Sequence, residues 1–186
     1  YVTQKGKKSG LKTEDRWLLS KLNSLAERSA KYNGSYHSEK SAKEILDFIL
    51  NDFSRWYIKI IRDRVWTNYT GKDKYSAFFT LLETTKILSR LLAPFCPFLA
   101  EEIHQNIVKK FDKSEESVHM EDFPLPQKKI INKKLEEEME IAKHIFEAAQ
   151  AARQAAGVKL RWPLREIVIV SEEKSVQSAV KNLNDI

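Results

Sequence analysis

The stretch Ser54-Arg55-Trp56-Tyr57-Ile58-Lys59-Ile60-Ile61-Arg62-Asp63-Arg64-Val65-Trp66 predicts a helix with two different faces. At about 100° per residue, Arg55, Lys59, Arg62 and Trp66 fall within an arc of roughly 60°. Three cations beside a flat aromatic ring suit phosphates and an unstacked base. The alternative is a solvated basic face with a packing tryptophan, and this helix alone does not decide between the two.

The other face of the same helix is apolar and predicts a contact with the protein core. We expect the helix to begin at Ser38 and to run to about Tyr69, where Gly71 stops it. Arg64 lies near the apolar side, so it is expected to bind a buried carboxylate rather than an external ligand. The predicted core face consists of Ala42, Ile45, Ile49, Phe53, Trp56 and Ile60.

Composition limits the class of protein. The chain has 186 residues, of which 42% are hydrophobic, and carries a net charge of +6 with 26 acidic residues among the bases. A polyanionic partner is therefore plausible, although charge alone is weak evidence. The N-terminus carries no signal-peptide pattern and the longest apolar stretch is too short to span a bilayer, so a cytoplasmic protein is expected. The chain starts at Tyr1 rather than Met, which predicts a piece of a longer protein.

Helical periodicity with breaks at Pro94, Pro97 and Gly71 predicts a mostly α protein, an antiparallel helical bundle. Thr13 is expected to cap the first helix, and the single Cys96 is expected to be buried in its apolar surroundings. Expected core positions include Leu18, Leu22, Leu25, Tyr75, Phe78, Leu82, Leu88 and Leu91. The expected order is a flexible lead-in (1–12), a helical domain (13–157) made of the bundle (13–111), a strap (112–131) and a bracing helix (132–157), and a final segment (158–186).

The pattern changes after Gly157, which suits a helix C-terminus. The run Ile167-Val168-Ile169-Val170 is β-branched and predicts a buried strand, followed by a helix from about Ser171. One strand and one helix cannot form a stable sheet by themselves. We therefore expect residues 158–186 to begin a small α/β junction module.

A second basic cluster surrounds the turn between the helix that ends near Gly157 and the expected strand. No acid interrupts it, and Trp162 lies in its middle, so it can clamp phosphates and stack a base. The alternative is that Trp162 wedges between bundle and sheet while Arg161 holds a carboxylate. The cluster comprises Arg153, Lys159, Arg161, Trp162 and Arg165.

Catalytic chemistry is not visible in the sequence. The four histidines and Cys96 show no metal-ligand spacing, and none of the five glycines forms a phosphate-cradling loop. No serine has the surroundings of a nucleophile elbow. We predict no catalytic residue and no metal site in this chain.

Several motifs in order along the chain resemble one protein family. The segment Asp15-Arg16-Trp17-Leu18-Leu19-Ser20-Lys21-Leu22-Asn23 resembles the start of the anticodon-binding domain of class I aminoacyl-tRNA synthetases of the isoleucyl/valyl/leucyl group. The stretch 54–66 resembles the isoleucyl version. Residues 88–103 resemble the APFxPFxxEEI signature, 117–124 the SVH strap, and 153–164 the RxxxxxKxRxPL junction of isoleucyl enzymes.

This resemblance implies a domain that binds the anticodon stem-loop of an isoleucine-accepting tRNA. It implies a longer parent enzyme that attaches isoleucine to tRNA using ATP and magnesium, with zinc possible elsewhere in that parent. The HIGH and KMSKS motifs of the family are absent from the sequence, so this chain alone is expected to be inactive and to hold no cofactor. Its other expected partners are the catalytic and C-terminal domains of the same parent.

Three alternatives remain at this point. The chain could come from the valyl branch of the same group. It could be a protein-interaction bundle that kept the fold without binding RNA, an interpretation that the basic, Trp-bearing helix disfavours. A free-standing enzyme is disfavoured by the absent catalytic motifs.

Overall fold

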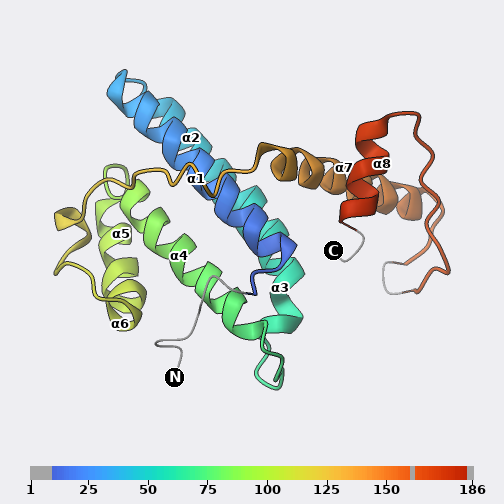
Figure 1. Cartoon of the computed structure of the whole chain (residues 1–186), viewed down its shortest axis with the longest axis horizontal. Coiled ribbons are helices and arrows are strands. Elements are labelled where there is room, and N and C mark those ends of the chain that lie inside the picture. Colours follow the sequence, from blue (N-terminus) through green and yellow to red (C-terminus); the bar gives the residue numbers. More distant parts are fainter. Residues whose placement is uncertain (1–9, 160–161, 184–186) are drawn as a thin grey trace. The chain divides into compact units, whose positions relative to one another are not determined.

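The structure, a computed structural model, describes residues 10–159 and 162–183 (Figure 1). Its described part is helical and contains no strand. The chain forms two compact units, Tyr1–Ile131 and Asn132–Ile186. The second unit contains both the expected bracing helix (132–157) and the final segment (158–186). The domain boundaries expected from the sequence stay a prediction.

The first unit is a bundle of antiparallel helices, which confirms the predicted class. Figure 1 shows α1 and α2 side by side, with α4 packed along α1. In chain order its elements are α1 (Thr13–Gly34), α2 (Ser38–Asp47), η1 (Phe48–Tyr57), α3 (Ile58–Val65), α4 (Lys74–Leu92), α5 (Pro97–Ile103), η2 (His104–Val108), α6 (Lys109–Phe111) and the short 3₁₀ turn η3 (Val118–Met120).

Helix α1 forms the centre of this bundle. Trp17, Leu18, Leu22 and Leu25 are almost completely buried, as their helical spacing predicts. The expected cap at Thr13 is wrong, because the helix begins at Thr13 and Lys12 occupies the N-cap position. The Lys12 backbone N–H donates to Asp15 Oδ2 at 3.0 Å, so an acid in the first turn closes this end of the helix.

A π-helical segment, η1, interrupts the long second helix and shifts its buried face. Its wider turns place bonded groups five residues apart instead of four. Except for Ile45, the core face predicted from a regular helix is only half-buried. The residues that are buried follow a spacing of three, four, five, four and three: Ile45, Phe48, Asp52, Tyr57, Ile61 and Arg64.

The corner between α4 and α5 is more exposed than its composition predicts. Of the expected core positions on α4, Leu88 and Leu91 near the corner are buried, while Tyr75, at the other end of the helix, is 55% exposed. Cys96, expected to be buried, is exposed, and so is Phe98. Pro97 begins α5 as predicted, since the first turn of a helix does not use its missing N–H. The turn therefore points apolar side chains outward rather than closing over them.

The strap that follows α6 is held by side chains of the helices. The Glu101 carboxylate accepts hydrogen bonds from the Ser117 hydroxyl at 2.8 Å and the Val118 backbone N–H at 3.0 Å. A hydrogen bond from Gln105 is the largest cause that lowers the pKa of Glu101, and the Ser117 and Val118 donors lower it further. Farther along, Asn23 Oδ1 of α1 accepts from the Gln127 backbone N–H at 2.8 Å.

The second unit consists of α7 (Lys133–Ala155) and α8 (Lys174–Asn182) with an extended segment between them. The Asn132 side chain caps α7 by accepting from the Leu135 N–H at 3.1 Å, and Gly157 follows it at φ +67°, as the sequence predicts. Buried Glu138 of α7 accepts hydrogen bonds from two residues of α8, Asn182 at 2.8 Å and Ser178, one turn earlier, at 3.3 Å.

The predicted strand is absent from the described residues, and the α/β module that it was expected to begin is not supported. Residues 166–170 are extended, but no other described segment pairs with them. Val168 is 75% and Val170 is 91% exposed, so this run is not part of a core. A β-branched run needs a neighbouring strand to form a ladder, and composition alone does not supply that neighbour.

Candidate nucleic-acid interface

The first cluster, defined as Arg55, Lys59, Arg62 and Trp66, lies on the outside of the first unit. All four side chains are exposed, and the Trp66 indole retains 63% of its accessible surface. Arg55 donates to Asn51 Oδ1 at 3.2 Å on its own helix. Among the described residues, no acid pairs with Arg62. The packing alternative for Trp66 is therefore wrong, because this ring is not in the core.

Trp66 is presented at the point where the helix ends. The chain was expected to stay helical to about Tyr69, but α3 ends at Val65 and Trp66 is extended, with ψ 147°. The Lys74 ammonium explains the earlier end, because it donates to the carbonyls of Trp66 (2.8 Å), Thr67 (3.2 Å) and Tyr69 (3.1 Å). These hydrogen bonds replace helical ones and hold the backbone that carries the indole.

Arg64 faces the opposite way and is buried, as predicted. Its Nη1 and Nη2 lie 3.1 and 2.8 Å from the two carboxylate oxygens of Asp15, a paired geometry that fixes the guanidinium plane. It also binds Glu14 and the Ser76 hydroxyl, and its Nε lies 3.3 Å from Asp73 Oδ2. One arginine thus joins α1, α3 and the start of α4 directly behind the first cluster.

The charges of this buried centre stabilise one another. Burial lowers the pKa of Arg64, but hydrogen bonds and charge from Asp15 and Glu14 outweigh burial and raise the pKa overall. Burial and the Asp15 carboxylate raise the pKa of Tyr57, so its hydroxyl stays protonated and donates to Asp15 Oδ1 at 2.6 Å. The first cluster therefore rests on a rigid, ionised support.

The second cluster lies in the second unit and is described only in part, since Arg161 falls outside the described residues. Lys159, Trp162 and Arg165 are exposed, and Trp162 retains 60% of its accessible surface. Arg153 differs from them, because its Nη2 donates to the backbone carbonyls of Lys159 at 2.8 Å and Trp162 at 2.6 Å. Arg153 therefore binds the backbone of the segment that carries the other side chains of the second cluster.

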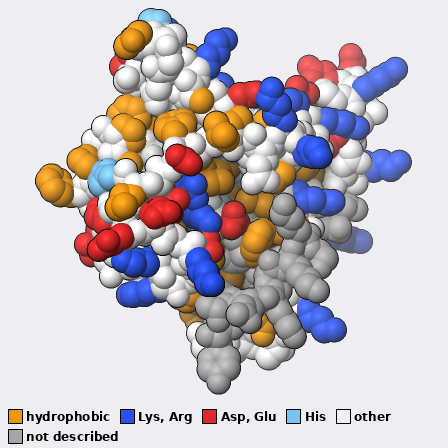
Figure 2. Space-filling model, turned by 60° about the vertical axis from the view of Figure 1, so that its left-hand side comes forward, with side chains coloured by type: hydrophobic (Ala, Val, Ile, Leu, Met, Phe, Trp, Pro, Cys, Tyr) orange, Lys and Arg blue, Asp and Glu red, His pale blue; other side chains and the backbone are white. Residues whose placement is uncertain are grey.

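The predicted site residues thus fall into two groups, one in each unit. Arg55, Lys59, Arg62 and Trp66 share one unit, while Arg153, Lys159, Trp162 and Arg165 share the other. The view in Figure 2 shows basic and acidic side chains interspersed, with apolar ones between them. Charge density alone therefore does not outline an interface on this face.

Other kinds of site find no support in the described part of the chain. No group of three or more His, Cys, Asp and Glu side chains could hold a metal ion there. No described helix is long and apolar enough to cross a membrane. The exposed cations and indoles remain the groups with an evident ligand chemistry, that of phosphates and unstacked bases.

Comparison with known proteins decides the family. Residues 15–169 match the family described as the anticodon-binding domain of tRNA ligase. The chain belongs to this family. It is 44% identical over 173 residues to the isoleucine–tRNA ligase of Pyrococcus abyssi, covering 93% of this chain and 16% of that protein. The corresponding enzyme of Methanosarcina mazei is 43% identical over 180 residues, covering 96% of this chain and 17% of that protein.

The family motifs divide into two kinds, since those at 54–66 and 153–164 contain the first cluster and most of the second, while others hold the fold together. The motif residues Asp15, Asn23 and Glu101 have structural roles: Asp15 holds Arg64, Asn23 holds the strap at Gln127, and Glu101 holds Ser117 and Val118. They specify the bundle of the anticodon-binding domain. The first cluster lies on the surface of this bundle, and the second cluster lies in the other unit.

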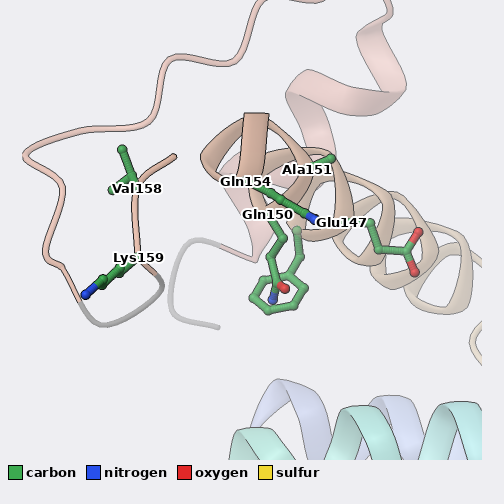
Figure 3. A pocket seen from close by; sticks show the side chains of 7 residues that line it. Glu147, Gln150, Ala151, Gln154, Val158 and Lys159 are labelled. Carbon is green, nitrogen blue, oxygen red and sulfur yellow. The ribbon is translucent and has the colours of Figure 1, made fainter. Parts of the chain in front are cut away.

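One feature of the anticodon-binding domain was missed by sequence reasoning. A pocket of about 500 Å³ lies in the second unit between the last turns of α7 and the segment at Val158 and Lys159 (Figure 3). In the sequence, this end of α7 is a run of small residues that suggests no site. Two glutamines spaced four apart, Gln150 and Gln154, were the available signal.

Proposed function

We propose that this chain binds the anticodon stem-loop of an isoleucine-accepting tRNA. The observation that carries the proposal is 44% identity over 93% of the chain to an isoleucine–tRNA ligase, within a family described by anticodon binding. The exposed clusters support it, because each combines cations with an accessible indole. The chain spans 16–17% of the length of the relatives it matches. We accordingly propose that it serves a longer ligase that carries out ATP-dependent isoleucylation.

The two kinds of side chain in these clusters have different roles in the proposal. Arg55, Lys59 and Arg62 bind phosphates and set the position of the stem-loop, because a cation binds every sequence alike. Trp66 and Trp162 stack on anticodon-loop bases, which are unstacked easily and present flat faces. The larger enzyme supplies the ATP, the magnesium and any zinc site, and it acts in the cytoplasm.

The proposal is tested by direct binding. The chain is titrated into fluorescently labelled isoleucine tRNA, valine tRNA and a duplex RNA of similar length, at fixed salt. We expect the tightest binding for isoleucine tRNA, weaker binding for valine tRNA and the weakest for the duplex. Preference for valine tRNA would favour the valyl alternative. Equal binding of all three RNAs would contradict anticodon recognition.

A second candidate function has one observation in its favour. The corner between α4 and α5 exposes Cys96, Phe98 and Leu99, an apolar group that suits a protein contact. A contact with another domain of the longer ligase is compatible with tRNA binding. If the corner were the main binding surface, the chain would fail to shift any tRNA and would instead associate with protein.

A further inference from the structure

The loop between α3 and α4 (residues 66–73, Figure 1) carries Trp66, and its backbone closes on that residue. The Tyr69 N–H donates to the Trp66 carbonyl at 3.1 Å. The Lys74 ammonium donates to the same carbonyl at 2.8 Å, so two donors meet at one oxygen. The backbone that carries the indole is therefore fixed by the loop residue Tyr69 and by the first residue of α4.

The aromatic ring of Tyr69 lies across Gly71. A Cβ atom on Gly71 would lie 2.5 Å from Cε1 and from Cζ of that ring and would also overlap its hydroxyl oxygen. Cβ atoms essentially never approach other atoms within 3.0 Å. Gly71 does not have a positive φ, so an alanine would fit its backbone conformation. The ring therefore requires a glycine at this position, whereas the helix itself already ends at Val65.

The Tyr69 hydroxyl fixes the ring by donating to Asp73 Oδ1 at 2.7 Å. This hydrogen bond is the largest cause that raises the pKa of Tyr69, so the hydroxyl remains protonated at neutral pH. The other carboxylate oxygen, Oδ2, lies 2.9 Å from Lys12 Nζ and 3.3 Å from Arg64 Nε. The ring cannot leave Gly71 without breaking a hydrogen bond to a carboxylate that two cations hold.

Asp73 also connects the loop to the buried centre of the bundle. Its backbone carbonyl accepts hydrogen bonds from Arg64 Nη2 at 2.9 Å and from the Ser76 hydroxyl at 2.8 Å. Lys12, which binds its carboxylate, occupies the N-cap position of α1. One residue at the end of the loop thus binds groups at the start of α1, on α3 and on α4.

The loop itself adds little to the core. Trp66 and the residues at 67, 68, 70 and 72 are exposed, and Tyr69 is half-buried. In a loop that buries so little apolar surface, these hydrogen bonds stabilise one loop conformation more than they stabilise the fold. A segment that is already ordered loses less entropy when a ligand binds it. The Trp66 indole is the large side chain that this order positions.

We infer that Tyr69, Gly71 and Asp73 hold the Trp66 backbone in the conformation that binds tRNA. These three residues, named here the loop anchor, are positioning residues that act through Trp66 and need no contact with the RNA. Gly71 leaves room for the ring, the ring reaches Asp73, and Asp73 binds the bundle. The inference rests on the proposed function, since it concerns how one part of the tRNA-binding surface is shaped before the tRNA arrives.

The test compares Gly71→Ala, which displaces the Tyr69 ring, with Gly34→Ala. Gly34 is the matched control, because a Cβ atom there meets nothing within 4 Å. Both substitutions are made in the wild type and in Trp66→Ala, and the affinity of the 186-residue chain for isoleucine tRNA is measured. Tyr69→Phe, which removes only the hydroxyl, is a second variant, with the exposed Tyr75→Phe as its control. Urea unfolding checks that each variant is folded.

We expect Gly71→Ala to weaken tRNA binding about 2- to 12-fold, the loss that follows when the loop must be ordered during binding. Tyr69→Phe should weaken it less, and the two controls should leave it unchanged. In the Trp66→Ala background, Gly71→Ala should have no further effect, because the loop anchor acts through the indole. Losses of equal size in both backgrounds would overturn the inference, and so would a Gly71→Ala variant that binds like the wild type.

A second readout needs no RNA. The chain contains four tryptophans, and fluorine NMR of the chain labelled with fluorotryptophan follows the signal of each. Gly71→Ala should shift the Trp66 signal, assigned from Trp66→Phe, and leave the signal of buried Trp17 in place. An unchanged Trp66 signal would overturn the inference while leaving the proposed function intact. Failure of the wild type to bind isoleucine tRNA would reject the proposed function and, with it, the inference.

Discussion

Arg62 and Arg64 lie two residues apart on α3 and have opposite environments. Arg64 is 6% exposed and bound by Glu14, Asp15, Ser76 and the Asp73 backbone carbonyl. Arg62 is exposed and has no acidic partner among the described residues. The inner face of this helix therefore holds the bundle together, while the outer face remains available to a polyanion. Chemically identical side chains differ in role because of where the helix places them.

The largest effect should come from the inner arginine. Arg64→Ala leaves the carboxylates of Glu14 and Asp15 buried without their cation, which should lower the free energy of unfolding by about 3–5 kcal/mol. Arg62→Ala is the control and should change it by less than about 0.5 kcal/mol. Urea unfolding followed by circular dichroism measures both. Similar stability for the two variants would contradict the division into inner and outer faces.

The exposed indole at the end of α3 should give the next largest effect. Trp66→Ala removes a stacking surface and should weaken binding of isoleucine tRNA by about 1–3 kcal/mol. The loss of affinity should be smaller for a tRNA with a mutated anticodon, so the difference in affinity between the two tRNAs becomes smaller. Phe98→Ala, which removes another exposed ring, is the control. A lower melting temperature with unchanged discrimination would assign Trp66 a structural role.

The outer cations should have a smaller and less selective effect. Arg62→Ala should weaken cognate and mutated tRNAs alike, because binding to a phosphate carries no sequence information. The slope of log affinity against log salt should become shallower by about 0.7–0.9 for each phosphate that the variant no longer neutralises. A weaker affinity for one anticodon alone would instead make Arg62 a base-reading residue.

Acid should weaken Asp73, which lies against the inner arginine. A hydrogen bond from Tyr69 is the largest cause that lowers the pKa of Asp73 from 3.8 to about 2, and the Lys12 ammonium lowers it further, while burial opposes them. The stability that ionised Asp73 contributes is complete above pH 3.8 and is lost as the pH falls toward 2. In urea unfolding from about pH 5 to about pH 2, Asp73→Asn should lack that part of the decline. If the free energies of unfolding of the wild type and of Asp73→Asn declined in parallel, the stabilising role of ionised Asp73 would be refuted.

Much of the first unit could be predicted from the sequence, because helical spacing and prolines act locally. The buried face between residues 48 and 57 could not, since the π-helical segment changes the spacing only in the folded bundle. The absence of a strand at residues 167–170 could not be predicted either, since strand formation depends on a pairing partner that composition does not reveal. The exposure of the cations and indoles could be predicted. The hydrogen bonds from Arg153 to the Lys159 and Trp162 carbonyls could not, because they depend on the path of the backbone. The pocket could not be predicted from the sequence, because it lies between α7 and residues that follow the end of that helix.

The most direct test of the central claim is a salt titration of tRNA binding. The affinity of the chain is measured for isoleucine tRNA and for the same tRNA with a mutated anticodon, at several salt concentrations. We predict that both affinities fall steeply with salt, because cations hold the phosphates, and that the cognate tRNA binds more tightly at every salt concentration, because side chains read its bases. Affinities that are equal for the two tRNAs and independent of salt would contradict the account.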